Sequence, residues 1–186
     1  MEQNSKLRIQ IEEEFGKLIY SYTTHQYCSN YYLKLDKVLK VMEIVLSSII
    51  TCGIVTNLIT YQFVCTIITS LLSLALLIVA SISKAGDYQL KAVKHSQTAL
   101  DLWDIREKYV SLLTEFDTLS EKSIIARRDD LLERTKTIYS YEERTNDKAY
   151  KRAQKALKNE EYQYFSKQEI NVLLPSQLRH NIDDEN

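Results

Sequence analysis

The sequence predicts an all-α membrane protein, in which a two-transmembrane helical hairpin joins long cytosolic helices packed as a helical bundle. The first observation is that forty consecutive residues, Ile44 to Ser83, carry no charged side chain. A stretch of that length can hold two membrane spans, because about 20 residues of helix cross the hydrocarbon core of a bilayer. The second observation is that the whole chain contains only three Gly and one Pro, which favours long helices on either side of the spans.

The two spans are predicted at residues 39–58 and 63–82, on either side of a short break. The alternative is a helical hairpin buried in a soluble core, but a chain of 186 residues is too short to cover two uniformly apolar helices. The mean hydropathy of −0.28 hides this pattern, because it averages one very apolar block with highly charged flanks. The predicted organisation is an N-terminal cytosolic helix at 1–38, the hairpin at 39–83 and a cytosolic helical region at 84–186.

Basic residues next to the spans predict the orientation of the hairpin. Three lysines precede the first span and three follow the second, whereas the connecting loop at 59–62 has no charge: Lys34, Lys37 and Lys40; Lys84, Lys91 and Lys94. By the positive-inside rule, both termini are expected in the cytoplasm. No secretory signal is expected, because about 40 polar residues precede the first apolar stretch. Cys28 is then cytosolic and Cys52 and Cys65 lie within the spans, so no disulfide is expected.

The segment before the membrane has helical spacing of apolar residues over 5–38. It becomes rich in tyrosine from Tyr20 onwards. We expect Tyr20 and Tyr22 to pack between helices, and Tyr31 and Tyr32 to lie at the level of the lipid headgroups. His25 and Cys28 share a helix face, but two residues do not make a metal site, and none is expected.

Small side chains recur in both spans and form a candidate pore or packing stripe. The stripe consists of Ser47 and Thr51 in the first span and Thr66, Ser70, Ser73 and Ala80 in the second. Such a stripe indicates close packing of helices, or a narrow wet path when several copies assemble. One protomer with two spans cannot enclose a pore, so the second interpretation requires a homo-oligomer. Glu43 is either paired with Lys40 near the headgroups or is a carboxylate at a pore mouth.

The region after the membrane is predicted to fold back along the first helix. Apolar residues recur at helical spacing from Leu90 to Phe116, and a further helix is expected at 120–140, with Ser120 as its N-cap. A capping box at 166–169 opens a last short helix. Pro175 is expected to end that helix, and residues 181–186 are expected to be frayed.

Residues 146–160 form a basic stretch within this region. Its basic residues fall within about half of a helix surface: Lys148, Lys151, Arg152, Lys155 and Lys158. One interpretation is a solvated helix face. The other is a partner-docking surface for a polyanion, either nucleic acid or lipid headgroups.

The sequence offers no catalytic constellation. It has no Gly-rich phosphate loop, no paired metal ligands and no nucleophile motif, and His25, His95 and His180 lie far apart in the chain. We therefore expect no enzyme activity and no cofactor.

Three features together resemble a known family. The residues Tyr20-Ser21-Tyr22-Thr23-Thr24-His25 come first, then the lysine-flanked hairpin, then Leu102-Trp103-Asp104-Ile105-Arg106-Glu107-Lys108-Tyr109. This arrangement covers nearly the whole chain and resembles the SLATT proteins, two-transmembrane effectors found beside nucleotide-sensing and other bacterial conflict systems. The stretch Lys148-Ala149-Tyr150-Lys151-Arg152-Ala153 and the final capped helix resemble the branch often coupled to reverse transcriptases.

The resemblance implies an antiviral effector in the bacterial inner membrane. Such an effector oligomerises to permeabilise the membrane and causes growth arrest or cell death when triggered. The implied partners are the lipid bilayer, further copies of the chain, and a cytosolic trigger, which is either a reverse transcriptase with its nucleic acid product or a nucleotide-signal system. The resemblance carries over no catalytic residue. The alternative function is a membrane-anchored scaffold that recruits a cytosolic partner without forming a pore.

Overall fold

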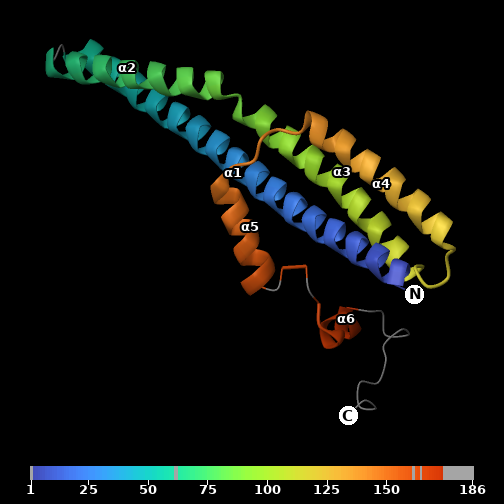
Figure 1. Cartoon of the computed structure of the whole chain (residues 1–186). Helices are drawn as coiled ribbons and strands as arrows, with labels where there is room; N and C mark the ends of the chain where they lie inside the picture. Colours follow the sequence, from blue (N-terminus) through green and yellow to red (C-terminus); the bar gives the residue numbers. More distant parts are fainter. Residues whose placement is uncertain (1, 61–62, 161, 164, 174–186) are drawn as a thin grey trace.

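A helical hairpin extends from one end of a helical bundle in the computed structural model of the chain (Figure 1). The structure describes residues 2–60, 63–160, 162–163 and 165–173, and within these residues it is helical with no strand. The helices are α1 (Glu2–Thr60), α2 (Phe63–Gly86), α3 (Tyr88–Thr114), α4 (Glu121–Tyr141), α5 (Asp147–Asn159) and α6 (Lys167–Leu173). The all-α hairpin and bundle predicted from the sequence are therefore confirmed.

Helix α1 runs without a break from the bundle into the first span. The sequence indicated a cytosolic helix and a separate span, but the structure joins them in one helix of 59 residues, about 90 Å long at 1.5 Å per residue. Gly16 lies within it without ending it. The first span is therefore a direct extension of the bundle.

The second span is joined to the bundle differently, through a one-residue break. Asp87 lies between α2 and α3 with φ 45° and ψ 43°, a left-handed conformation, which ends one helix and redirects the next. A Cβ atom on Gly86 would lie 2.2 Å from the ring of Tyr88. Glycine thus leaves room for that ring to close over the break, and a larger residue would displace the ring.

The core of the bundle lies between α1, α3 and α4. Helix α3 returns along α1, as predicted, and α4 packs mainly on α3. The core side chains are Leu7, Ile11 and Leu18 of α1, Leu102, Ile105, Tyr109 and Leu112 of α3, Phe116 after it, and Ile124, Leu131 and Ile138 of α4. Helix α5 packs on α1 through Ala149, Ala153 and Ala156, which are buried.

The predicted helix starts are confirmed by their caps. The backbone N–H of Ser123 donates to Oγ of Ser120 at 3.3 Å. In α6, the N–H of Glu169 donates to Ser166 Oγ at 3.2 Å and the N–H of Ser166 donates to Glu169 Oε2 at 2.8 Å, which is a capping box. The expected stop at Pro175 and the frayed end at 181–186 lie outside the described residues.

The tyrosines of α1 divide between two roles. Tyr20 lies 6.1 Å from Tyr150 and Tyr22 lies 5.0 Å from Trp103, between ring centroids, so both pack between helices as predicted. Tyr31 is exposed. Tyr32 also packs against the opposite helix, where it stacks on Tyr88 and on a buried histidine of α3; the level of Tyr31 and Tyr32 relative to the lipid headgroups stays a prediction.

We expect Tyr109→Phe to stabilise the bundle by about 1 kcal/mol. Tyr109 is completely buried, and its hydroxyl has no hydrogen-bond partner among the described residues. Folding therefore desolvates the hydroxyl without a compensating bond, and phenylalanine removes that cost at almost the same volume. Urea unfolding in detergent micelles, followed by fluorescence of Trp103, the single tryptophan, measures the change. A loss of about 1 kcal/mol in the free energy of unfolding, instead of a gain, would show that the Tyr109 hydroxyl forms a hydrogen bond in the folded protein.

Candidate functional site

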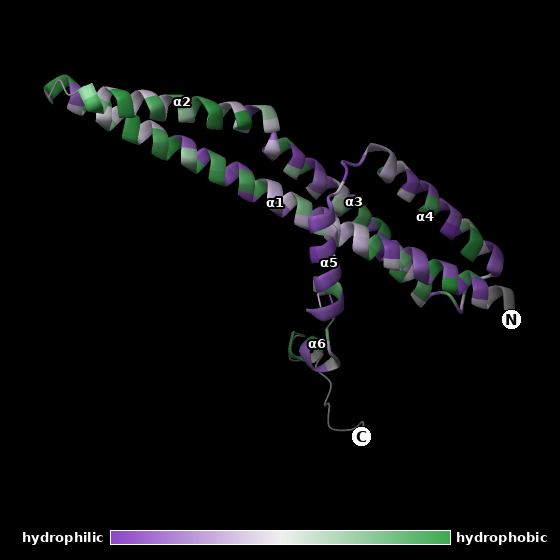
Figure 2. Cartoon of the chain, turned by 60° about the vertical axis from the view of Figure 1, so that its left-hand side comes forward, coloured by the Kyte–Doolittle hydropathy of each residue, from purple (hydrophilic) through white to green (hydrophobic). Residues whose placement is uncertain are grey.

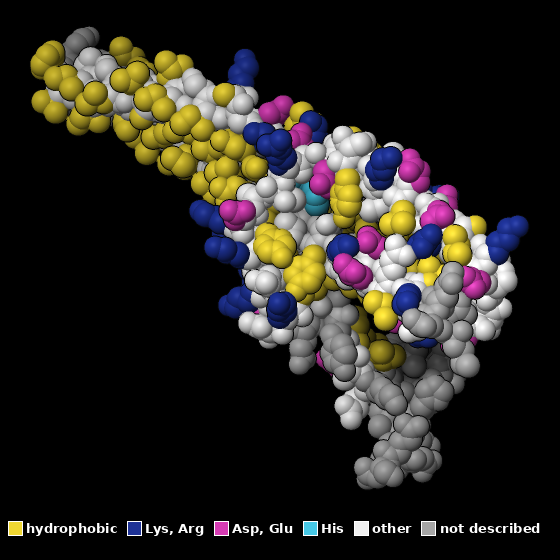
Figure 3. Space-filling model, in the orientation of Figure 1, with side chains coloured by type: hydrophobic (Ala, Val, Ile, Leu, Met, Phe, Trp, Pro, Cys, Tyr) yellow, Lys and Arg dark blue, Asp and Glu magenta, His cyan; other side chains and the backbone are white. Residues whose placement is uncertain are grey.

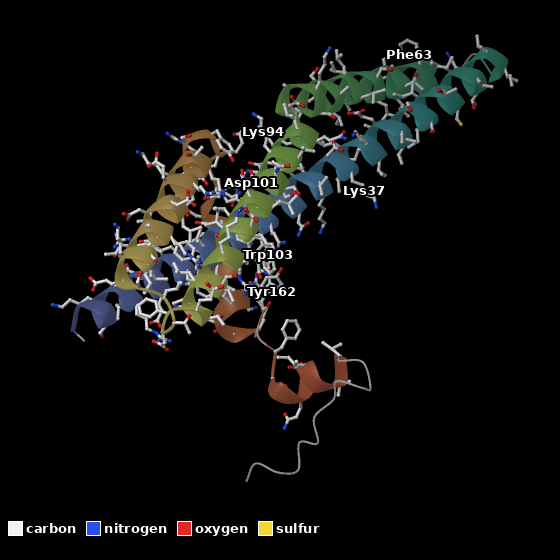
Figure 4. The ribbon with its side chains drawn as sticks, turned by 90° about the vertical axis from the view of Figure 1, so that its right-hand side faces the viewer. Lys37, Phe63, Lys94, Asp101, Trp103 and Tyr162 are labelled. Atoms are coloured by element: carbon white, nitrogen blue, oxygen red, sulfur yellow. The ribbon has the colours of Figure 1, made fainter. Side chains whose placement is uncertain are left out.

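The hairpin is apolar and almost uncovered by the rest of the protein. The most apolar 18-residue windows of its two helices are 6% and 0% buried. Figure 2 shows the hairpin ribbon coloured mostly hydrophobic, and Figure 3 shows its apolar surface beyond the bundle. In Figure 4, Lys37 marks the near end of the hairpin and Phe63 its far end. A soluble protein would bury helices of this kind, so their exposure favours a two-span membrane segment over a hairpin buried in a soluble core.

The two spans touch along a seam that sequence reasoning did not identify. A Cβ atom on Gly53 would lie 2.3 Å from Cγ2 of Thr69, so the methyl group of Thr69 packs in the space that a larger residue would fill. Nearer the tip, Nδ2 of Asn57 donates to Oγ1 of Thr66 at 2.8 Å, which joins the helices through a polar bond where water is scarce. The signal was present in the sequence, because Gly53 is the one glycine inside a span.

Most residues of the predicted stripe do not lie in this seam. Ser47, Thr51, Thr66, Ser70 and Ser73 are exposed and Ala80 is half-buried. The hydroxyls of Ser47, Thr51 and Ser70 donate to carbonyls three or four residues earlier in their own helices. Their donors are therefore satisfied without another helix, and the side chains remain available on the outer surface of the hairpin.

Helical phase places these exposed residues on one face of the hairpin. At about 100° per residue, Ser47 and Thr51 lie about a quarter to a third of a turn from the seam of α1, and Ser70 and Ser73 lie a similar distance from the seam of α2. Because the helices are antiparallel, these two sides coincide. We call this surface the small-residue face; it consists of Ser47, Thr51, Ser70 and Ser73, and Thr66, which accepts the bond from Asn57, lies at its border with the seam.

Glu43 is not paired as one interpretation of the sequence suggested. The ammonium of Lys40 lies 2.7 Å from Asp36 and donates to Gln89 at 3.1 Å. Oε1 of Glu43 is enclosed without a hydrogen-bond partner among the described residues. Glu43 lies at the end of the spans next to the bundle with one oxygen unsatisfied, and its role at a pore mouth stays a prediction.

The basic residues of α5 all lie on its exposed side, opposite the buried alanines. They divide into two sets. Arg152 and Lys155 lie 2.5 and 3.7 Å from Glu160, and Arg152 also lies 5.4 Å over the ring of Tyr27. Lys148, Lys151 and Lys158 are exposed and have no described carboxylate within ion-pair distance. The docking surface predicted from sequence therefore exists as an exposed basic face, and its binding of a partner stays a prediction.

Comparison with family models identifies the whole arrangement. The model of the SMODS and SLOG-associating 2TM effector domain family 4 matches residues 7–169. The chain belongs to this SLATT family. The match covers the bundle, both spans and the start of α6, and it confirms the resemblance inferred from the sequence, although it does not specify the reverse-transcriptase branch. No curated protein and no solved structure matches the chain.

The SLATT domain contains a buried histidine pair that sequence reasoning missed. His25 of α1 and His95 of α3 are each 1% exposed. Their Nδ1 atoms lie 3.0 Å apart, and Nε2 of His25 lies 3.1 Å from Oε2 of Glu142 at the end of α4. These three side chains join three helices at the membrane end of the bundle. The signal was the heptad spacing of His25 with Leu18 and of His95 with Leu102, since both leucines are core residues.

The electrostatics of this cluster favour neutral histidines. Burial, together with the neighbouring His95, lowers the pKa of His25 to about 4. Burial also lowers the pKa of His95 and raises the pKa of Glu142. All bonds are satisfied when Nε2–H of His25 donates to Glu142 and Nδ1–H of His95 donates to Nδ1 of His25. The cluster thus holds α1, α3 and α4 together near neutral pH.

We expect acidification to destabilise the bundle. His25 binds its proton more weakly in the folded state than in the unfolded chain, so stability is present above the unfolded pKa of 6.5 and is lost as pH falls towards 4. The loss from His25 is about 3 kcal/mol between pH 7 and 4. Glu142 offsets part of it, because its raised pKa makes protonation favour the fold.

Urea unfolding at several pH values, followed by Trp103 fluorescence, measures this dependence. The matched variant is His25→Gln, which removes the titrating group and keeps a hydrogen-bonding side chain. Its stability is expected to be lower at pH 7 but to change less with pH. Equal slopes for the wild type and the variant would show that His25 is not the responsible group.

Proposed function

We propose that the chain is the membrane effector of a bacterial antiviral defence system. In this proposal, copies of the hairpin assemble in the inner membrane and permeabilise it, which stops growth or kills the infected cell. The family to which the chain belongs is a two-transmembrane effector domain associated with defence systems. The proposal gives the chain no catalytic step.

The observation that carries the proposal is the small-residue face. Ser47, Thr51, Ser70 and Ser73 lie on the outside of the hairpin, where a single copy would present them to lipid. Small polar side chains allow helix backbones of different copies to approach closely. Several hairpins that meet through this face would line a shared path with hydroxyls, and the unsatisfied carboxylate of Glu43 lies at its cytosolic end.

We further propose that a cytosolic trigger controls this assembly. The candidates are a reverse transcriptase with its nucleic acid product or a nucleotide-signal system. The basic face of α5 supports a polyanionic or acidic partner, and the continuous helix α1 gives that partner a direct connection to the first span.

Membrane potential in cells tests the proposal. Induced overproduction raises the concentration of protein in the membrane and favours oligomers by mass action. A potential-sensitive dye is expected to report depolarisation before growth stops, and purified protein in liposomes is expected to release an entrapped small dye. Intact potential and tight liposomes, with the trigger confirmed and present, would reject permeabilisation.

We expect both termini of the chain in the cytoplasm. Lysines flank the hairpin on one side, and the tip carries no charge. The test uses a variant whose three native cysteines are replaced. In intact cells, Ser5→Cys in this variant is expected to stay unlabelled by an impermeant thiol reagent, and Ile59→Cys is expected to react. Labelling at Ser5 from outside would reverse the topology.

The alternative function is a scaffold anchored in the membrane. One observation favours it: the exposed basic face of α5 is a recruitment surface that does not need a pore. In that case, pull-down of an acidic partner would depend on α5, while the membrane would stay tight during every response.

A further inference from the structure

A basic and aromatic cavity lies where the bundle meets the membrane. It has a volume of about 730 Å³ and lies between α1, α3 and the first turns of α5. Its basic lining residues are Lys34, Lys91, Lys148 and Arg152. Figure 3 shows Lys and Arg side chains gathered at this neck, between the apolar hairpin and the bundle.

Three of the four basic residues of this cavity have no described ion-pair partner, whereas Arg152 is paired with Glu160. Asp147 is its one acidic lining residue, and no described carboxylate lies within ion-pair distance of Lys34, Lys91 or Lys148. The ammonium of Lys91 lies 5.6 Å from the ring centroid of Tyr88. Aromatic rings hold such a cation in place without cancelling its charge, so the cavity is prepared for an anion.

The cavity opens onto the lipid-facing side of α1. Tyr27, Tyr31 and Lys34 line it, and at helical spacing the same face continues through Val38, Val41 and Val45 into the span. Tyr31, Val38, Val41 and Val45 are each about half exposed. An acyl chain that lies along these valines would therefore place its headgroup in the cavity.

We propose that this cavity binds the phosphate group of an anionic phospholipid from the leaflet that faces the bundle. The lysines donate to the phosphate oxygens, and the tyrosine hydroxyls reach the hydroxyls of the headgroup. This site depends on the membrane location alone and not on permeabilisation. A free phosphorylated compound has the same chemistry, but it would leave the valine side of the cavity without an occupant.

The bound lipid would connect the parts of the chain that meet at the break before α3. Tyr88, which lines the cavity, follows the left-handed Asp87 and covers Gly86. The phosphate would contact α1, α3 and α5 together. The lipid is thus placed to set the angle between the second span and the bundle.

Native mass spectrometry of the full chain from nanodiscs tests this site. The discs contain phosphatidylcholine with a minor share of phosphatidylglycerol, and the wild type is expected to retain phosphatidylglycerol preferentially. Lys34→Gln with Lys91→Gln is expected to lower this retention about tenfold or more, since each lysine contact with anionic lipid contributes a severalfold factor. Lys148→Gln, on a different helix, is a second variant that does not depend on the folding of the first.

The matched control is Lys37→Gln with Lys84→Gln, which removes two charges at the same membrane boundary outside the cavity. Retention close to wild type in this control supports the proposal. An equal loss in both pairs means general surface attraction and overturns it. Glycerol 3-phosphate added to discs of phosphatidylcholine alone separates the sources: binding as strong as that of the lipid would reassign the cavity to a soluble phosphate compound and overturn the lipid assignment.

Discussion

Leucine at both Ser70 and Ser73 is expected to abolish membrane permeabilisation without preventing insertion. The two serines lie one turn apart on the exposed surface of α2, within the small-residue face. Each leucine replaces a hydroxyl oxygen with three carbon atoms where the backbones of neighbouring copies would meet. The substitution also raises the hydrophobicity of the span, so insertion is favoured and not impaired. We expect depolarisation after triggering to fall to the level of cells without the protein.

The control for this experiment is Cys52→Leu with Thr56→Leu. These side chains are exposed on α1, and helical phase places them on the side of the hairpin opposite the small-residue face. They add similar volume and should leave permeabilisation close to wild type. If the Ser70 and Ser73 variant is present in the membrane at wild-type amounts and still depolarises cells, the small-residue face is not the working surface.

The sequence was sufficient to predict those elements that depend only on neighbouring residues in the chain. The span lengths follow from an uncharged stretch, and the starts of α4 and α6 follow from Ser120 and Ser166, whose side chains accept bonds from their own first turns. These features need no knowledge of the rest of the fold. The region boundary at residue 38 follows a change from charged to apolar residues, and α1 runs through it because such a change breaks no backbone hydrogen bond.

The sequence was not sufficient for features that depend on how two helices are rotated against each other. His25 and His95 are 70 residues apart, and they meet because α3 returns along α1 with both histidines turned inwards. The seam at Gly53 and Thr69 is of the same kind. The stripe prediction selected small residues by type and spacing, which does not tell which of them contact the partner helix and which face outwards.

The second large effect is expected from charge reversal on the outer side of α5. In the triple variant Lys151→Glu, Lys155→Glu and Lys158→Glu, the exposed surface changes from basic to acidic. The alanines that attach α5 to α1 are untouched, and so is Arg152, which borders the cavity at the neck. We expect the protein to insert normally and to lose its response to the trigger, because a polyanionic or acidic partner is now repelled.

The response to overproduction separates loss of triggering from loss of the pore. Overproduction drives assembly by concentration, so the triple variant is still expected to depolarise cells under that condition, whereas the Ser70 and Ser73 variant is not. A control with the same change of charge is Lys122→Glu, Arg127→Glu and Lys136→Glu on the exposed side of α4, which should respond to the trigger normally. If the triple α5 variant responds to the trigger like the wild type, the basic face of α5 is a solvated surface and not a docking site. Loss of response in both variants would mean that net charge, and not a docking site on α5, controls the effector.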